Sequence, residues 1–281
     1  MKKVLKTVVL CLGMLFAFVS CGQSEKGDGL SREEASKKAQ EIFAMQGSAN
    51  FESPRSFLIE EEETLKIIGN AKEKKYTTNL VTKTLHSLNL DNETFYATSS
   101  THGIDEEGKQ KDLVVSVWAY LDETKFYCVM KRNDEVDIVS YRKNKDFKFV
   151  EAIQSYIISC NVIIENQNVL NIEHFENYED EDLLPYGISF TSPNAKYTSS
   201  KDGEFGIQFQ AQIATKNGSA ADGIEVEGKN EQGIHFENYV LKNSSAQTTM
   251  HLSSENVNLE FEKTSQTQVD YAQSPFEMPK L

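Results

Sequence analysis

Apolar residues in the middle of the chain recur at every second position. They form the runs Val115-Val117-Ala119-Leu121, Phe126-Cys128-Met130 and Val136-Ile138. Polar residues at 122–123 and 133–134 separate these runs. Apolar residues two apart, interrupted by polar turns, are typical of an antiparallel meander with one buried face.

The last third of the chain repeats this spacing. Ile207, Phe209, Ala211 and Ile213 alternate with glutamines, and further alternating pairs continue to Phe261. Asn217-Gly218 is a hairpin-turn dipeptide. Upstream, residues 76–101 are rich in threonine and aromatic residues, which suit a pleated, half-buried surface. Residues 57–68 resemble a strand at both ends, but the Glu60–Glu63 run leaves their assignment open.

Two segments have helical spacing instead. Ser31 and Glu34 fit a capping box, apolar residues follow at three- and four-residue steps, and Gly47 is a plausible stop, which predicts a helix over 31–46. From Asp146 to Ile164 apolar residues recur at the same steps and predict a second helix. Its apolar stripe requires a large partner surface, and a sheet face is the natural candidate.

The order of elements is therefore helix, strands, helix, strands. It predicts an α+β fold in which a strongly curved antiparallel sheet, a half-barrel, carries helices packed on its concave face. We expect a single domain over 31–281. Two small α+β domains in tandem are the alternative.

The first twenty residues differ from the rest of the chain. Lys2, Lys3 and Lys6 precede an apolar run from Val8 to Val19, which is shorter than the roughly 20 residues of a membrane-spanning helix. A positive start followed by a short apolar run predicts a secretory signal peptide over 1–20.

The end of that run, Ser20-Cys21, resembles the lipobox of bacterial lipoproteins, although Phe18 stands where the family usually has leucine. The resemblance implies cleavage before Cys21 and lipid attachment to its sulfur. Two or more acyl chains anchor a protein stably. We therefore expect a lipid-anchored protein on the outer side of the cell membrane, with residues 21–30 as a flexible tether.

Two further cysteines, Cys128 and Cys160, lie in apolar contexts. Burial as small apolar side chains is one interpretation. A disulfide between them, allowed outside the cytoplasm, is the other.

The balance of charge excludes two classes of partner. The chain has 29 Lys and Arg residues against 43 Asp and Glu residues, and three of the lysines belong to the expected signal peptide. Nucleic acids and anionic lipid headgroups both attract basic surfaces. Contact with the membrane is therefore expected through the lipid alone.

No sequence motif indicates a reaction, a cofactor or a metal site. The five histidines lack metal-ligand spacing, and no nucleophile-elbow, phosphate-loop or dinucleotide-binding pattern occurs. The acidic runs at 60–63 and 173–182 fit a solvated surface. We expect no catalytic residues; a hydrolase with a site assembled from scattered residues is the least favoured hypothesis.

The segment from Val117 to Tyr127, with Trp118, Tyr120 and Phe126, is similar to the central strands of LolA-like lipoprotein carriers. That family is a half-barrel whose helices cover an apolar concavity, and its members bind lipid-like molecules. The resemblance implies a non-catalytic protein that holds an apolar or lipid-like ligand, with Trp118, Tyr120, Phe126, Ile153 and Ile157 lining the site. A structural protein of the cell envelope, with a filled core and a protein partner, is the alternative.

Overall fold

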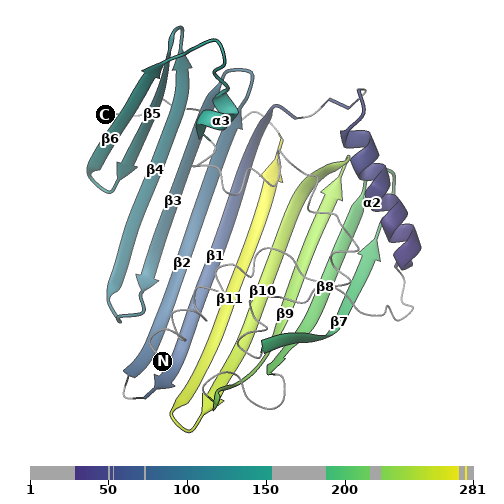
Figure 1. The fold of residues 1–281 in the computed structure, drawn as a ribbon, viewed down its shortest axis with the longest axis vertical. Coiled ribbons are helices and arrows are strands. Elements are labelled where there is room, and N and C mark those ends of the chain that lie inside the picture. Colours follow the sequence, from purple (N-terminus) through teal and green to yellow (C-terminus); the bar gives the residue numbers. More distant parts are fainter. Residues whose placement is uncertain are drawn as a thin grey trace.

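One continuous antiparallel sheet dominates the computed structural model, which describes residues 29–49, 51–52, 54–72, 74–153, 188–215, 223–271 and 276. Its strands follow the order β6-β5-β4-β3-β2-β1-β11-β10-β9-β8-β7. The chain therefore builds two meanders, one on each side of the pair formed by β1 and β11 (Figure 1).

The elements have these bounds: α2 (Arg32–Gln46), β1 (Ser56–Ala71), β2 (Lys74–Asn89), β3 (Thr94–Ile104), β4 (Gln110–Asp122), β5 (Lys125–Arg132), β6 (Glu135–Arg142), α3 (Phe149–Ile153), β7 (Ile188–Thr198), β8 (Phe205–Thr215), β9 (Glu225–Glu237), β10 (Val240–Ser254) and β11 (Val257–Asp270). The alternating runs at 115–121, 126–130, 136–138 and 207–213 all fall within these strands.

The acidic run Glu60–Glu63 lies inside β1, so residues 57–68 are a strand. Side chains alternate between the two faces of a strand, and here Glu60 and Glu62 are exposed on one face while Phe57, Ile59 and Ile67 are buried on the other. The run is tolerated because it lies in the middle of β1, where its register neighbours on β2 and β11 are nearly all polar.

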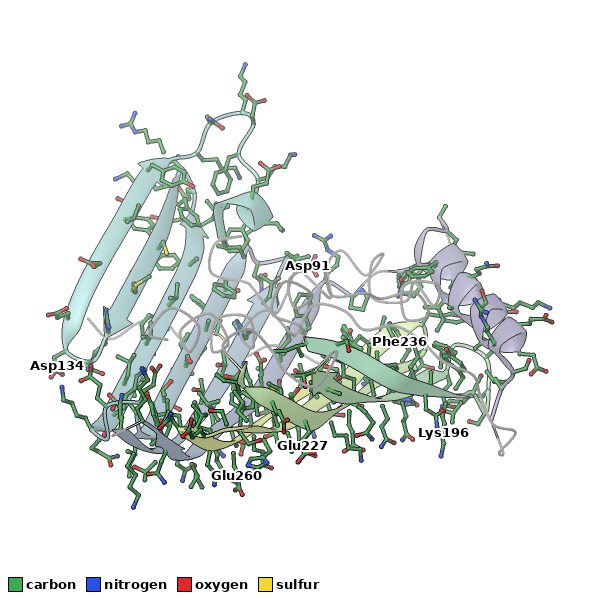
Figure 2. The ribbon with its side chains drawn as sticks, turned by 60° about the horizontal axis from the view of Figure 1, so that its bottom comes forward. Asp91, Asp134, Lys196, Glu227, Phe236 and Glu260 are labelled. Atoms are coloured by element: carbon green, nitrogen blue, oxygen red, sulfur yellow. The ribbon has the colours of Figure 1, made fainter. Side chains whose placement is uncertain are left out.

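The face of the sheet that carries Phe57 and Ile59, here called the core face, holds two apolar clusters. The helix-end cluster includes Phe57, Leu88, Phe95, Phe126, Phe205 and Phe236 together with residues of both helices. The far-end cluster includes Ile67, Ile213, Val226, Leu252, Leu259 and Phe261, at the opposite ends of the strands. Figure 2 shows Glu227, Glu260 and Lys196 projecting from the other side, the outer face, away from α2 and α3.

Helix α2 confirms the first helix expected from the sequence. The Glu34 amide donates to Ser31 Oγ (3.4 Å) and the Ser31 amide donates to Glu34 Oε2 (2.8 Å), which completes the capping box. The helix ends at Gln46, before Gly47. Its buried residues, Ala35, Ala39 and Ile42, form a narrow stripe that joins the helix-end cluster beside β7.

The prediction of an α+β fold with helices packed on a concave face is wrong. The structure is mostly antiparallel sheet that does not close, and the two described helices lie near one end of it (Figure 1). Helix α2 lies beside β7, and the ring of Phe149 in α3 is 6.1 Å from that of Phe126 at the start of β5. The long strands, up to 16 residues in β1 and β2, outweigh a 15-residue and a 5-residue helix. Of the second expected helix, residues 154–164 lie outside the described part of the chain.

Two glycines allow neighbouring strands to approach closely at the far end of the sheet. Gly69 has a φ of 135°, and a Cβ there would lie 2.1 Å from the Asn258 carbonyl oxygen of β11. Gly103 has a φ of 131° and would meet the Asn79 carbonyl oxygen of β2 at 2.0 Å. Both positions need a residue without a side chain, because the backbone angle and the available space each exclude a Cβ.

We expect Gly69→Ala to lower the free energy of unfolding by about 2–4 kcal/mol, because it combines overpacking with an unfavourable backbone angle. Urea denaturation of the two proteins measures the difference. Gly47→Ala is the matched control, since its φ is −83° and the nearest atom to an added Cβ is 3.4 Å away. Equal losses in both variants would contradict the close-approach argument.

Candidate functional site

A band of polar side chains, here called the polar belt, crosses the core face between its two apolar clusters. Its members lie mid-strand in β1, β2, β3, β9, β10 and β11: Glu61, Glu63, Thr82, Thr84, Ser99, Thr101, Asn230, Gln232, Thr248, Lys263, Ser265 and Thr267. Asn230, Thr248 and Ser265 are buried, whereas Glu61, Thr84, Ser99 and Thr101 are partly exposed. The middle of the core face is therefore polar and, over β1 to β3, partly accessible.

Hydrogen bonds between neighbouring strands hold the belt in place. The hydroxyls of Thr82 and Thr101 share a bond of 3.0 Å, and the Thr84 hydroxyl donates to Ser99 Oγ at 3.2 Å. In the other half of the sheet, Asn230 Nδ2 donates to Thr248 Oγ1 at 2.8 Å. Cross-strand pairing fixes these side chains, and it also gives the buried side-chain amide of Asn230 a hydrogen-bond partner.

One ion pair joins the two halves of the belt. Lys263 Nζ lies 3.0 Å from Glu63 Oε2, and the lysine side chain is only 12% exposed. The two residues are diagonal neighbours across the β1–β11 junction, because Glu63 lies directly opposite Ser265 and Lys263 lies directly opposite Leu65. This ion pair has no net charge, and it places one ammonium and one carboxylate side by side at the centre of the belt.

His86 stands where the belt meets the helix-end cluster. It is paired with Ile59 and Ala97 on the neighbouring strands, is 6% exposed, and has its ring 6.3 Å from that of Phe95. Burial lowers the pKa of the imidazole from 6.5 to about 4, because the charged form loses its water. Its Nδ1 finds no hydrogen-bond partner among the described residues.

Thr78 is a second buried polar group of this kind. It lies on the core face of β2 opposite Ile67, in the far-end cluster, and its Oγ1 is buried without a hydrogen-bond partner in the described part of the structure. Buried polar atoms are nearly always paired with protein or water, so each exception needs an explanation. One strand, β2, thus carries on each side of the belt a buried polar atom that no described residue pairs.

The outer face has two adjoining hollows over β7 to β11 and β1, of about 810 and 390 Å³. In the larger one, Lys66 Nζ contacts Glu262 Oε2 at 3.1 Å. His251 Nε2 contacts Asn258 Oδ1 at 2.9 Å, and its Nδ1 lies 3.5 Å from Glu227. The hydrogen bond to Asn258, followed by that to Glu227, raises the pKa of His251. These lining groups are engaged with one another, which favours an ordinary solvated strand surface.

The structure does not bring the five expected ligand-lining residues together. Phe126 and Ile153 are buried in the helix-end cluster on the core face. Trp118 and Tyr120 lie on the outer face, because they alternate with the core-face residues Val117 and Ala119. Ile157 lies outside the described residues.

Trp118 and Tyr120 instead belong to an aromatic patch on the outer face of β3, β4 and β5. The ring of Trp118 is 5.3 Å from that of Tyr96, and Tyr120 stacks on Tyr127 at 5.2 Å. Phe276, near the end of the chain, lies 6.2 Å from Tyr120. Burial raises the pKa of the Tyr120 hydroxyl.

The expected lipidation site, Cys21, and the second half of the possible disulfide, Cys160, lie outside the described residues. Cys128 is buried on the core face of β5. No helix among the described residues is long and apolar enough to cross a membrane. Within the same residues, no group of three or more His, Cys, Asp or Glu side chains is placed to hold a metal ion. Lipid attachment, disulfide and domain limits stay predictions.

Sequence reasoning missed the polar belt and His86. The threonines of residues 76–101 were recognised as strand residues, but the alternation alone does not say which of them face the core. The signal was present in β2, where Thr82, Thr84, His86 and Leu88 share one face at a spacing of two. The spacing identifies this face as the buried one only once Leu88 is known to lie in the helix-end cluster.

No protein-family model matches the chain, and no curated protein matches it. Among solved structures, it is similar to a beta-barrel-like protein of a domain of unknown function from Brucella abortus, with 10% sequence identity over 76% of this chain and 97% of that one. The TM-score is 0.26.

We expect acid to destabilise the protein through His86. The folded-state pKa of about 4 lies below the unfolded value of 6.5, so protonation favours the unfolded chain. The free energy of unfolding is unaffected above pH 6.5 and falls as the pH drops towards 4, by about 2 kcal/mol from this group at pH 5.

His86→Phe should remove this part of the loss between pH 7.5 and pH 5, measured by urea denaturation at each pH. His251→Gln is the control, because that ring is on the outer face and its pKa is shifted in the opposite direction. The same pH dependence in wild type and His86→Phe would show that His86 is not buried as described.

Proposed function

We propose that this chain is a lipid-anchored binding protein, held outside the cytoplasm, that carries an apolar or lipid-like ligand along the core face of its sheet. The proposed location outside the cytoplasm is based on residues 1–21, which have a positive start, a short apolar run and a lipobox-like end. The binding role rests on one observation: a partly exposed polar belt lies between two apolar clusters on the same face.

The dimensions of the face suit an elongated ligand. Strands of 16 residues at about 3.3 Å per residue extend for about 50 Å. Along β1 and β2 the side chains of the core face are apolar, then polar, then apolar again. That sequence matches an amphipathic molecule whose polar group sits near the Glu63–Lys263 pair and whose apolar parts extend towards the clusters.

The unpaired polar atoms of β2 support the same site. His86 Nδ1 and Thr78 Oγ1 lie at the two margins of the belt and have no hydrogen-bond partner among the described residues, so a ligand or a water molecule bound with it would supply one. Ligand pockets are mostly apolar with a few placed polar groups. In this proposal, these two atoms and the belt hydroxyls orient the ligand.

We favour binding over catalysis because hydrogen bonds between neighbouring strands fix the hydroxyl groups of the belt in position. Thr82 bonds Thr101 and Thr84 bonds Ser99, so each of these hydrogen bonds joins two hydroxyls. Nucleophilic catalysis by a hydroxyl needs an adjacent base to take its proton.

Two adjacent serines of β3 test the binding face. Ser99 points to the core face within the belt, and Ser100 points to the outer face. We expect Ser99→Trp to fill the belt and reduce uptake of a fluorescent fatty acid at least about tenfold, because the ring occupies the ligand's place. Ser100→Trp adds the same ring one residue away and should leave uptake unchanged.

Native mass spectrometry of both variants, prepared without detergent, provides the second readout. Wild type and Ser100→Trp should retain lipid-sized mass that leaves on denaturation, and Ser99→Trp should not. Circular dichroism checks that each variant folds. A clean mass for the wild type, together with no fatty-acid uptake, would move the function to binding another protein.

Cys21→Ala tests the anchor separately. The variant should take up no labelled palmitate in growing cells and should remain unprocessed or be released from the membrane, because the acceptor sulfur is gone. Cys128→Ala is the control, since that buried residue belongs to the sheet and should leave labelling intact. Continued labelling of Cys21→Ala would exclude the lipobox assignment.

A further inference from the structure

The two edge strands of the sheet, β7 and β6, differ in how far other described parts of the chain cover them. At β7, the Leu30 amide donates to the Tyr197 carbonyl at 2.9 Å, α2 packs alongside, and the register shifts between Thr191 and Asn194. Such features prevent an edge strand from pairing with another chain. At β6, no described strand or helix covers the outer edge, and its pairing with β5 is regular over all eight residues.

Strand β6 is also unusually apolar for an exposed edge. Every residue from Glu135 to Arg142 is exposed. Four of them are large and apolar: Val136 (44%), Ile138 (55%), Val139 (54%) and Tyr141 (44%). They make up more than half of the exposed large apolar residues that the described structure contains. A long, regular, apolar edge is the surface on which strands add to a sheet.

The hydrogen-bond pattern shows which backbone groups are available. The Lys143 amide donates to the Thr124 carbonyl, at 2.9 Å, so residue 143 points towards β5. Backbone groups alternate between the two sides of a strand, so Val139 and Tyr141 also point towards β5. The amides and carbonyls of Val136, Ile138, Ser140 and Arg142 therefore face outward.

The charges along β6 identify the strand that fits. Acidic residues, Asp134, Glu135 and Asp137, stand at its start, and basic residues, Arg142 and Lys143, stand at its end. A parallel copy would place like charges together. An antiparallel copy places the acidic start of each strand against the basic end of the other, so the strand is complementary to itself.

We propose that β6 pairs antiparallel with β6 of a second copy of this chain, joining two sheets edge to edge around a two-fold axis. The axis passes through Val139, which faces its own equivalent. Glu135 then lies opposite Lys143 of the second copy and Asp137 opposite Tyr141, all on the core face. The outward groups of Val136, Ile138, Ser140 and Arg142 form the hydrogen bonds. The pairing goes beyond the proposed ligand site and does not depend on it.

Ser140→Pro tests the backbone pairing. The Ser140 amide faces outward, so proline removes a hydrogen bond to the second copy and leaves the β5–β6 ladder intact. We expect it to raise the dissociation constant of the dimer at least about tenfold. Ser140→Thr keeps the amide and should dimerise like the wild type.

A charge exchange tests the orientation and is independent of any effect of proline on folding. Glu135→Lys and Lys143→Glu should each weaken the dimer about three- to tenfold by placing like charges opposite one another. The double variant restores opposite charges on both sides of the axis and should recover dimerisation. Lys143 Nζ also lies 3.9 Å from Glu93 Oε2. The double variant lacks this contact, so its recovery of dimerisation would show that the contact is not required for the dimer.

The measurement is sedimentation equilibrium of the full lipidated chain in density-matched detergent, with micelles in excess so that two chains share a micelle only by binding. A concentration-dependent dimer, lost in Ser140→Pro and restored by the charge exchange, supports the proposal. A monomer at all concentrations up to about 100 μM overturns it. A dimer unchanged by Ser140→Pro, or a charge exchange that restores nothing, overturns it as well.

Discussion

The pairing of β1 with β11 is the constraint on which the rest of the structure depends. Fourteen register pairs, from Leu58↔Asp270 to Ala71↔Val257, join the first strand of the chain to the last. Without them each meander would expose a strand edge at its inner side, and each apolar cluster would be cut in two. The junction also carries the Glu63–Lys263 pair on the core face and the Thr64–Thr264 hydroxyl contact of 2.6 Å on the outer face.

That constraint explains which features were predictable from the sequence. The helix over 31–46 is encoded locally by its capping box, its apolar steps and Gly47, and it formed where expected. The alternating runs of β4, β5, β6 and β8 are equally local. The β1–β11 junction joins residues 200 positions apart, and no local pattern marks it. The prediction of a curved sheet with helices on its concave face was wrong for a related reason, because the pairing that organises the sheet leaves no local pattern in the sequence.

The candidate site was predicted less well than the strands, because a period of two gives the faces of a strand but does not say which face is inward. Trp118 and Tyr120 were expected in the site because of the resemblance to LolA-like carriers, and they lie on the outer face, opposite the core face that carries Phe126 and Ile153. The belt residues were overlooked because threonine and serine are common on exposed strands. Their place on the core face depends on cross-strand partners such as Ser265 and Asn230, far away in sequence.

The position of β11 at the centre of the sheet has a consequence for how the chain matures. A polypeptide that emerges N-terminus first, from a ribosome or a translocation channel, presents β1 to β6 long before the strand that pairs with β1. Until residue 270 is free, the first meander has two open edges and only part of each cluster. The molecule therefore cannot assemble piecemeal, and any factor that guards it against premature association must act until its final strand is released.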